Sequence, residues 1–368
     1  MLVSFFSLFV AVVVIQFIYY AIIFGKFSFA KPQSSTPKRI PISVIVCAKN
    51  EEENVKNFIP LLAEQDYPQF EIVLIDDASS DGTLDVLEEY EKKYQNIKLV
   101  KVENNEAFWG NKKFALTLGI KAAKYEYLLF TDADCYPVSK DWITKMSSQF
   151  TQQKNIVLGY GAYEKIAGTF LNKLIRFETL LAATQMFSWA KIGKPYTGVG
   201  RNMAYKREEF FKVRGFMDHM KIRSGDDDLF INQAANGTNT TICFAQDSFT
   251  YSKPKTTFKE WFTQKRRHVS TAGHYKFFDK LQLGIFFISQ FFFFILAIIL
   301  LAFQYQWIIV ASLIGFRYLF TWLTLGFAAG KLKEKDVMYW YPFIEIVLIF
   351  TQLNVFISNT FSKPVHWK

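Results

Sequence analysis

Two long apolar blocks, one at each end of the chain, restrict its possible folds more than any other feature. The first covers residues 2–25 and contains no charged residue. The second runs from about residue 281 to residue 360 and is divided by short polar segments. A helix needs about 20 predominantly apolar residues to cross the hydrocarbon core of a bilayer. We therefore predict membrane helices at both ends and a separate domain between them.

The N-terminal block is typical either of a membrane helix or of a cleaved signal peptide. A signal peptide has a positive leader and a small-residue cleavage site, and residues 2–25 show neither. Basic residues follow the block, as expected for a cytoplasmic flank; they are Lys26, Lys31, Lys38 and Arg39. We predict a membrane helix over residues 1–25 and a linker over residues 26–40, in which the Pro-containing stretch 32–37 is typical of a loop.

The C-terminal block divides into three candidate spans, over residues 281–303, 306–330 and 337–360. Arg317 interrupts the second span and Glu345 the third. Because charged side chains are costly inside a bilayer, these two residues either pair with each other or face a polar path. Our hypothesis is that they form an inter-helix pair.

The formal net charge of the chain is +10. This excess reflects either the basic flanks of membrane helices or attraction to anionic lipid or to a diphosphate substrate. Nucleic acid is not an expected partner, because only one short basic segment has interleaved aromatic residues. Cys47, Cys135 and Cys243 lack metal-ligand spacing and imply no disulfide framework, which fits a reducing compartment.

From Pro41 onward, short apolar segments alternate with longer amphipathic ones. The segments predicted as strands cover residues 42–48, 71–75, 97–102, 125–131 and 156–160. The segments predicted as helices cover residues 52–65, 83–94, 111–124 and 140–152. Nearly continuous apolar strands separated by helices indicate an α/β domain with a mostly parallel sheet covered on both faces. Ligands of such folds bind beyond the carboxyl ends of the strands.

Asp132 and Asp134 follow the strand predicted over residues 125–131. In extended backbone, residues i and i+2 point the same way, so both carboxylates can face one point. Two carboxylate ligands suit Mg²⁺ or Mn²⁺ together with substrate phosphates. An Asp-x-Asp pair also occurs in ordinary solvated turns. The metal interpretation is favoured because other polar groups follow other strands, at residues 49–51 and at Asp76 and Asp77.

Two segments further along admit two interpretations each. The loop 198–202 contains two glycines and either lets backbone approach a ligand closely or is a simple turn. Residues 166–190 carry Phe, Leu and Trp at helical spacing, which fits core packing or a helix at the membrane interface.

Residues 224–230 contain three adjacent aspartates, Asp226, Asp227 and Asp228. Adjacent carboxylates repel each other, so at least one should bind its proton more tightly, as suits a general base. A solvated acidic loop with a helix cap is the alternative.

The basic segment 264–268 lies near Phe258, Trp261 and Phe262. It is typical of an amphipathic helix on anionic lipid, and equally of a clamp for a diphosphate. The two interpretations are compatible.

Taken together, these segments resemble the membrane-bound family-two glycosyltransferases. The similarity covers residues 41–268, in the opening strand and acidic turn at 41–54, the nucleotide motif at 76–83, the metal motif at 131–134, the general-base motif at 225–229, and the Gln-x-x-Arg-Trp motif at 264–268. The resemblance implies a GT-A fold, which is Rossmann-like, and metal-dependent sugar transfer with inversion. His268 stands where the family has Trp. In processive synthases that Trp lies beside the acceptor sugar, so its replacement counts against polymer synthesis.

The resemblance also implies roles for individual residues. Those implied to bind the nucleotide sugar are Ala48, Glu51, Asp77, Lys112 and Asp132. The metal would be held by Asp134 with Asp132, and the acceptor proton would be taken by Asp227, or by Asp226 or Asp228 in a shifted register. Those implied to contact the diphosphate or the acceptor are Gln264, Arg266 and Arg267.

The expected function is therefore transfer of a sugar from a nucleotide diphosphate sugar, in the first instance a UDP-sugar, to a lipid acceptor, with Mg²⁺ or Mn²⁺ as cofactor. A polysaccharide synthase that extends a glycan chain is the alternative, and a non-catalytic membrane scaffold is a remote one. A prenyl-diphosphate enzyme is disfavoured because its acidic motifs lie on helices, whereas Asp77 follows a strand and precedes Gly82. The motifs at residues 225–229 and 264–268 do not suit a nucleotidyltransferase.

The expected organisation is a multi-pass protein of the bacterial inner membrane. Its cytoplasmic catalytic domain, with interfacial helices, would cover residues 41–275, followed by three spans over residues 281–360 and a tail over residues 361–368. Its partners would be the nucleotide-sugar donor, a lipid or glycan acceptor and membrane lipids.

Overall fold

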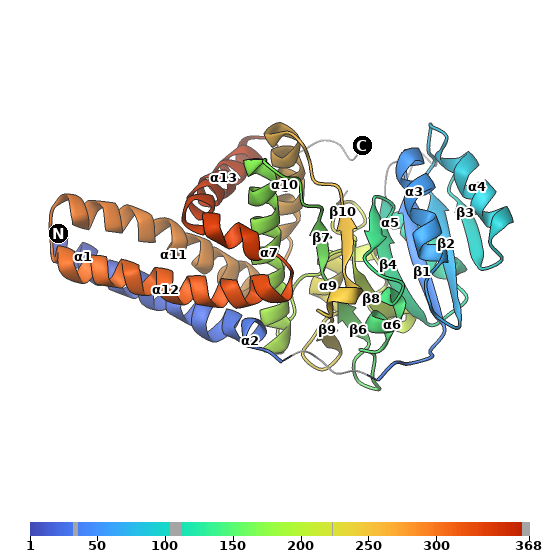
Figure 1. The fold of residues 1–368 in the computed structure, drawn as a ribbon, viewed down its shortest axis with the longest axis horizontal. Helices are drawn as coiled ribbons and strands as arrows, with labels where there is room; N and C mark the ends of the chain where they lie inside the picture. The colour runs from blue at the N-terminus through green and yellow to red at the C-terminus, as the bar shows by residue number, and fades with distance from the viewer. Residues whose placement is uncertain (32–35, 104–111, 223, 363–368) are drawn as a thin grey trace. The chain divides into compact units, whose positions relative to one another are not determined.

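The computed structural model describes residues 1–31, 36–103, 112–222 and 224–362, and Figure 1 shows their helices and strands. Contacts divide the chain into two units. The α/β unit comprises Pro32–Gly168 and Gly193–Thr256. The helical unit comprises Met1–Lys31, Thr169–Ile192 and Thr257–Pro364.

The α/β unit is built on a seven-stranded sheet with the order β3-β2-β1-β4-β8-β6-β9. Its strands are β1 (Ile42–Ala48), β2 (Phe70–Asp76), β3 (Ile97–Lys101), β4 (Tyr127–Asp132), β6 (Ile156–Leu158), β8 (Met203–Lys206) and β9 (Thr240–Ile242). Neighbouring strands are parallel except that β8 runs antiparallel to β4 and to β6. The predicted class, an α/β fold with a mostly parallel sheet, is confirmed.

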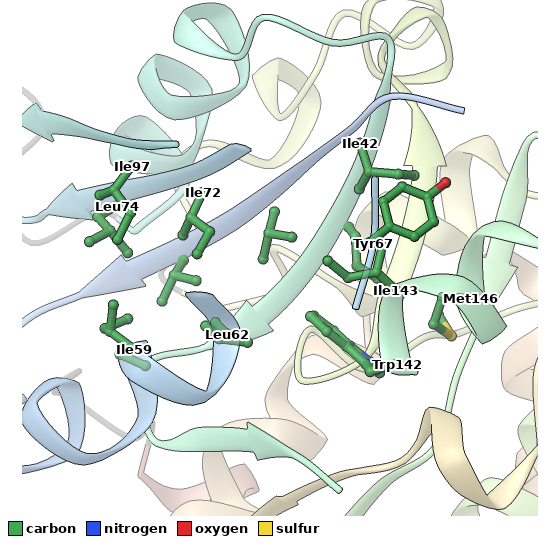
Figure 2. Close-up of a cluster of buried hydrophobic side chains, with 14 of the residues drawn as sticks. Ile42, Ile59, Leu62, Tyr67, Ile72, Leu74, Ile97, Trp142, Ile143 and Met146 are labelled. Carbon is green, nitrogen blue, oxygen red and sulfur yellow. The ribbon is translucent and has the colours of Figure 1, made fainter. Parts of the chain in front are cut away.

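Helices cover both faces of this sheet. They are α3 (Glu52–Ala63), α4 (Thr83–Lys93), α5 (Lys112–Ala122), α6 (Trp142–Ser147), α8 (Arg207–Lys212) and α9 (Asp228–Ala234), with short 3₁₀ turns at Met217–His219 and Gln246–Ser248. Ile72 and Leu74 of β2 point into a core shared with α3, α4 and α6 (Figure 2). Ile75 points the opposite way, as the two-residue period of a strand requires. It meets α5 at Gly119, where an added Cβ would lie 2.2 Å from Ile75 Cδ1.

A second, three-stranded sheet was not predicted. It consists of β5 (Cys135–Pro137), β10 (Thr250–Ser252) and β7 (Gly161–Tyr163), in the order β5-β10-β7. Strand β10 is antiparallel to β5 and parallel to β7. Since β5 begins immediately after Asp134, this small sheet fixes the backbone on the far side of the predicted metal pair.

In the described part of the helical unit, four helices are long and apolar enough to cross a membrane: Leu2–Ser28, Phe277–Ala302, Trp307–Lys331 and Lys335–Phe361. They correspond to the four predicted spans. Their elements are α1 (Leu2–Phe17), the π-helix η1 (Ile18–Phe24), α2 (Gly25–Ser28), α11 (Phe277–Ala302), α12 (Trp307–Lys331), the 3₁₀ helix η4 (Lys335–Trp340) and α13 (Tyr341–Phe361). The helices α7 (Phe170–Lys191) and α10 (Phe258–Ala272) belong to the same unit.

Arg317 and Glu345 form the hypothesised pair inside this unit. Arg317 Nη1 donates to Glu345 Oε2 at 2.7 Å, and a second bond joins Nη2 to Oε1. Arg317 also donates from Nε to Gln16 Oε1 at 2.7 Å and from Nη1 to the Tyr341 hydroxyl at 3.1 Å. The two charged side chains are 0% and 2% exposed. The pair therefore lies in the helix-packing interior and links α12 and α13 to α1.

Several element boundaries differ from the predictions. The helix predicted over residues 140–152 is a short helix that ends at Ser147, and the strand predicted over residues 156–160 ends at Leu158. Asn111, where a helix was predicted to begin, lies outside the described residues, as do residues 32–35 of the linker and 363–368 of the tail.

Candidate active site

The predicted donor-binding residues lie at the carboxyl edge of the parallel strands. Register pairs Ala48 with Asp76 across β1 and β2, and Cys47 with Asp132 across β1 and β4. The three strands therefore end side by side. Asp132 ends β4, Asp77 follows the end of β2, and the acidic turn at Glu51 follows the end of β1. The sheet therefore brings together groups that are far apart in the sequence.

The first group consists of Ala48, Glu51 and Asp77. The backbone N–H of Asp77 donates to the carbonyl oxygen of Ala48 at 2.9 Å. Lys49 Nζ lies 3.5 Å from Asp77 Oδ2. Burial raises the pKa of Asp77, although Lys49 opposes this effect. Asn54 donates to Glu51 Oε2 at 2.6 Å, which fixes the Glu51 carboxylate beside the same turn.

Hydrogen bonds between the loop after β1 and the loop after β2 stabilise this edge of the sheet. Asn50 and Ala78 have φ values of 54° and 51°, in the left-handed region that residues with a Cβ rarely adopt. The N–H of Ser80 donates to Asn50 Oδ1 at 2.8 Å, and the N–H of Asn50 donates to Ser79 Oγ at 3.1 Å. Strained backbone of this kind is found at ligand sites, where surrounding structure maintains it.

The second group is the predicted metal pair. Asp132, the last residue of β4, Asp134 and Cys135 place one potential ligand atom each within 4.8 Å of one another. Burial, with Asp132 and Glu51 nearby, raises the pKa of Asp134. Burial also raises the pKa of Cys135, so its thiol keeps its proton at neutral pH. Two carboxylates with a protonated thiol fit a hard cation such as Mg²⁺ or Mn²⁺ and do not fit a thiolate-bound metal.

Lys112 connects the metal pair to the three aspartates. Its Nζ lies 2.7 Å from Asp132 Oδ1 and 3.0 Å from Asp226 Oδ2. A small pocket lies at this place, and its lining includes Lys112, Asp132, Gly200 and Asp226 together with the apolar residues Phe130, Met203 and Tyr205. Asp132 at the end of β4 and Asp226 of the three-aspartate segment therefore meet at the side chain of Lys112.

The three adjacent aspartates have different environments. Burial alone would raise the pKa of Asp226, but the charge of Lys112 outweighs it and lowers that pKa. Burial and the charges of Asp226 and Asp228 raise the pKa of Asp227 to about 7. Asp227 is the N-cap of α9, and its Oδ1 accepts from the N–H of Asp228 at 2.8 Å. Asp227 is therefore the acid whose proton affinity best suits exchange near neutral pH.

The loop 198–202 contacts this acid through its backbone. The N–H of Gly200 donates to Asp227 Oδ2 at 2.7 Å. At Gly198, an added Cβ would lie 2.9 Å from Ile231 Cγ1, so glycine lets α9 pack close to the loop. Asn202 donates to the carbonyl oxygens of Tyr160 and Ser248 and fixes the end of the loop.

Lys113 was missed by the sequence analysis. Its side chain is 1% exposed, and its Nζ donates to the carbonyl oxygens of His219, Ile222 and Ser224 at 2.7–2.9 Å. It thereby holds the segment that leads into the three aspartates. The sequence did contain one clue to a separate role for Lys113. Consecutive residues of a helix point about 100° apart, so Lys112 and Lys113 had to face different surroundings.

Gln264, Arg266 and Arg267 lie on α10, in the helical unit, whereas the other predicted site residues lie in the α/β unit. Arg266 donates to Asn359 Oδ1 at 3.0 Å and to the carbonyl oxygen of Ser358 at 3.2 Å, near the end of α13. Lys265 Nζ lies 2.5 Å from Glu178 Oε2 on α7. Part of the basic segment therefore anchors α10 within the helical unit.

Comparisons with known proteins agree with this arrangement. The chain is 29% identical over 238 residues to the probable glycosyltransferase YdaM of Bacillus subtilis (strain 168), an alignment that covers 62% of this chain and 55% of that one. It is 28% identical over 192 residues to the dolichyl N-acetyl-alpha-D-glucosaminyl phosphate 3-beta-D-2,3-diacetamido-2,3-dideoxy-beta-D-glucuronosyltransferase of Methanococcus voltae, which covers 50% of this chain and 55% of that one. The chain spans about half the length, or less, of the curated relatives it matches.

A solved structure resembles the fold over most of the chain. It is the mannosyltransferase PcManGT from Pyrobaculum calidifontis, in complex with GDP-Man and Mn²⁺, with a TM-score of 0.57 and 19% identity over 90% of this chain and 99% of that one. The family model "Glycosyl transferase family 2" matches residues 43–224, which contain the strand-end acids and the loop 198–202. The chain belongs to glycosyl transferase family 2 and has a GT-A fold.

Proposed function

We propose that the protein is an inverting, metal-dependent glycosyltransferase that moves a sugar from a nucleotide diphosphate sugar to a lipid acceptor at the membrane. One observation carries this proposal. Lys112 lies within 3.0 Å of both Asp132 and Asp226, so the edge suited to a nucleotide and a metal adjoins the aspartates suited to proton transfer. Sugar transfer from such a donor needs both functions at one place.

In this proposal the donor nucleotide lies along the ends of β1 and β2. Ala48, Glu51 and Asp77 hold the uridine and ribose, and Lys112 and Asp132 lie toward the diphosphate. The hydrogen bonds between the loops at Asn50 and Ser80 support this role, because they keep the edge rigid before the donor arrives.

Asp132 and Asp134 would hold the metal. Mg²⁺ or Mn²⁺, when bound by these carboxylates, supplies positive charge that stabilises the departing diphosphate. Lys112 adds a fixed charge of the protein at the same position. Gln264, Arg266 and Arg267 contact the diphosphate or the acceptor in this scheme, as the family resemblance implies.

Asp227 acts as the general base. It takes the proton of the acceptor hydroxyl while that oxygen forms a bond to the anomeric carbon. The bond between that carbon and the diphosphate oxygen breaks, and the nucleoside diphosphate leaves. A single displacement inverts the anomeric centre. The N–H groups of Gly200 and Asp228 orient the Asp227 carboxylate, and its pKa of about 7 suits the proton transfer.

The apolar helices support the proposed acceptor and the proposed location. Among the residues that the structure describes, four helices could span a membrane, and we propose a multi-pass protein of the bacterial inner membrane with residues 41–275 as a cytoplasmic catalytic domain. The name of the relative from Methanococcus voltae describes transfer to a dolichyl-linked sugar phosphate, which supports a lipid-linked acceptor. A polysaccharide synthase is the second candidate. His268 in place of Trp counts against it.

The decisive experiment uses the purified full-length protein in nanodiscs. It would be incubated with a panel of UDP- and GDP-sugars and extracted membrane lipids, with Mn²⁺ or with EDTA. We expect Mn²⁺-dependent release of one nucleoside diphosphate and a glycosylated lipid detectable by mass spectrometry. Release of nucleoside diphosphate with growth of a polymer would favour the synthase. Absence of any donor turnover, with all donors and lipids tested, would favour a non-catalytic scaffold.

A further inference from the structure

We propose that Arg201 is a diphosphate-binding residue, which presents its guanidinium to the donor's phosphates beside Asp134. This inference rests on the proposed function and deepens it, because it adds a phosphate contact from the α/β unit itself. The argument depends on how the side chain is held, on what lies next to it and on the geometry of guanidinium groups.

The Arg201 side chain is held rigidly. Its Nη1 donates to Ser252 Oγ at 2.9 Å and to the carbonyl oxygen of Ala162 at 3.2 Å. Its guanidinium carbon lies 4.3 Å from the centre of the Tyr163 ring, a stacking distance for arginine. At Gly161, an added Cβ would lie 3.0 Å from Arg201 Cβ and 3.3 Å from Nε. Glycine at this position therefore makes room for the arginine against β7.

The small sheet brings this guanidinium to the metal pair. Ser252 of β10 is the register partner of Cys135 on β5, and directly opposed residues of an antiparallel pair have their side chains on the same face. Cys135 Sγ in turn donates to Asp134 Oδ1 at 3.4 Å. Arg201, Ser252, Cys135 and Asp134 are thus linked in series, by the bond from Arg201 to Ser252, the cross-strand pairing of Ser252 with Cys135, and the contact of the Cys135 thiol with Asp134.

Electrostatics agrees with this placement. Burial alone would lower the pKa of Arg201, but Tyr163, Cys135 and the carboxylates of Asp134 and Asp132 outweigh it and raise that pKa. Arg201 in turn opposes the raised pKa of Asp134. A permanent positive charge therefore interacts electrostatically with the two carboxylates that are expected to bind a divalent cation.

The sign of the Arg201 charge distinguishes a role in metal binding from a role in anion binding. A cation beside a metal site repels the metal ion, so Arg201 cannot serve metal binding in the absence of the donor. It does suit an anion that binds together with the metal. Among the described residues, both hydrogen bonds that Arg201 donates use Nη1, and a guanidinium has five N–H donors in a planar fork that matches phosphate oxygens.

The alternative is a purely structural role. Arg201 lies next to Gly200, whose N–H binds Asp227, and its contacts with β7 and β10 could simply fix the loop 198–202. The two roles make different predictions for three ligands: UDP or GDP, whichever the wild-type protein binds; the corresponding nucleoside; and Mn²⁺ alone.

The test compares Arg201→Met with Arg214→Met in the full-length protein in nanodiscs. Arg214 is an exposed arginine of the same unit, and its substitution removes the same charge. Affinities would be measured by calorimetry or competition. For Arg201→Met we expect about tenfold or greater weakening of nucleoside diphosphate binding in Mn²⁺, consistent with loss of a charged hydrogen bond. Nucleoside binding should be unchanged, and Mn²⁺ alone should bind at least as tightly as in wild type. Arg214→Met should change none of the three.

Equal weakening of the nucleoside and the nucleoside diphosphate, or weakening of all three ligands, would overturn the proposal in favour of a structural role. Unchanged binding of the nucleoside diphosphate would overturn it as well. If Arg201→Met does not fold, Arg201→Lys is the second variant, because it keeps the charge and removes the planar set of N–H donors. It should weaken nucleoside diphosphate binding selectively, by a smaller factor than Arg201→Met. A wild-type protein that binds no nucleoside diphosphate would contradict the proposed function itself.

Discussion

The backbone N–H of Gly200 donates a hydrogen bond to Asp227 Oδ2 at 2.7 Å. The other carboxylate oxygen accepts from the N–H of Asp228 at 2.8 Å. One acidic side chain is therefore oriented from two directions, by the loop before β8 and by the first turn of α9. A group held in this way can take a proton from a substrate without first reorganising, which is what a general base requires.

Asp227→Asn should abolish transfer while retaining donor binding. The substitution keeps the size of the side chain and removes its ability to accept a proton. Loss of general-base catalysis costs about 10²- to 10⁴-fold in rate. The rate would be followed as nucleoside diphosphate release, and donor affinity by calorimetry.

Asp85→Asn is the matched control, because Asp85 is an exposed residue of α4 in the same unit. It should leave both quantities at wild-type values. Turnover of Asp227→Asn at the wild-type rate would contradict the assignment of the base, and Asp226 or Asp228 would then be the next candidates.

Transfer should increase with pH through a midpoint near 7. In the proposed mechanism Asp227 accepts a proton only when it is ionised, and its pKa is raised from 3.8 to about 7 by burial and then by Asp226 and Asp228. Below this pH the base is protonated and transfer is slow. The profile of kcat against pH, measured with saturating donor and metal, tests the midpoint.

Asp228→Asn should move that midpoint to lower pH. It removes one of the two like charges that raise the Asp227 pKa, while burial and Asp226 remain. Asp85→Asn should leave the midpoint unchanged. A shift to higher pH in Asp228→Asn would show that another group controls the rate.

Metal binding should depend on Asp134 and not on Cys135. Both lie in the cluster whose potential ligand atoms are within 4.8 Å of one another. The buried Cys135 thiol remains protonated, and oxygen ligands are preferred by Mg²⁺ and Mn²⁺. We expect Asp134→Asn to weaken Mn²⁺ binding at least about tenfold. Replacing a residue that only hydrogen-bonds to a metal ligand typically costs that much affinity, and Asp134 is proposed to be a ligand itself.

Cys135→Ala should bind Mn²⁺ with wild-type affinity, and calorimetry with the metal alone measures both variants. Strong weakening in Cys135→Ala, or tight binding of Cd²⁺ that depends on Cys135, would show that sulfur is a ligand after all.

The central sheet was predictable because its strands carry a strong local signal. Ile42–Ala48 and Phe70–Asp76 are nearly continuous apolar runs, as strands buried on both faces require. Strand β8 and the small sheet were missed because Met203–Lys206 and Cys135–Pro137 are only four and three residues long. Segments of that length acquire strand geometry from their pairing partners rather than from their own residues.

The candidate site could be proposed from the sequence only in part. Asp77, Asp132 and Asp134 were selected as candidates because they follow predicted strands. Lys113 and Arg201 were not, because their roles depend on which carbonyl groups and rings the folded chain places beside them. For Arg317 and Glu345 the sequence left two interpretations open, and only the geometry of the helices chose between them.

That pair gives the last prediction, which concerns stability. Arg317 and Glu345 are almost fully buried and joined by two hydrogen bonds. Replacing one partner leaves the other charge buried without compensation, at a cost of about 3–5 kcal/mol. Arg317→Leu and Glu345→Leu should therefore each lower the melting temperature in nanodiscs markedly. Replacing both residues should recover much of the loss, because well-packed apolar residues often replace a buried ion pair without penalty.

Ser312→Leu, an exposed position on α12, controls for the added apolar side chain and should have little effect. The coupling energy from this double-mutant cycle isolates the interaction of the two side chains from their separate contacts, such as Arg317 with Gln16. If the losses of the single variants simply add in the double variant, the two residues do not stabilise the helical unit as a pair. Gln16 and Tyr341 would then be the partners that hold Arg317 in place.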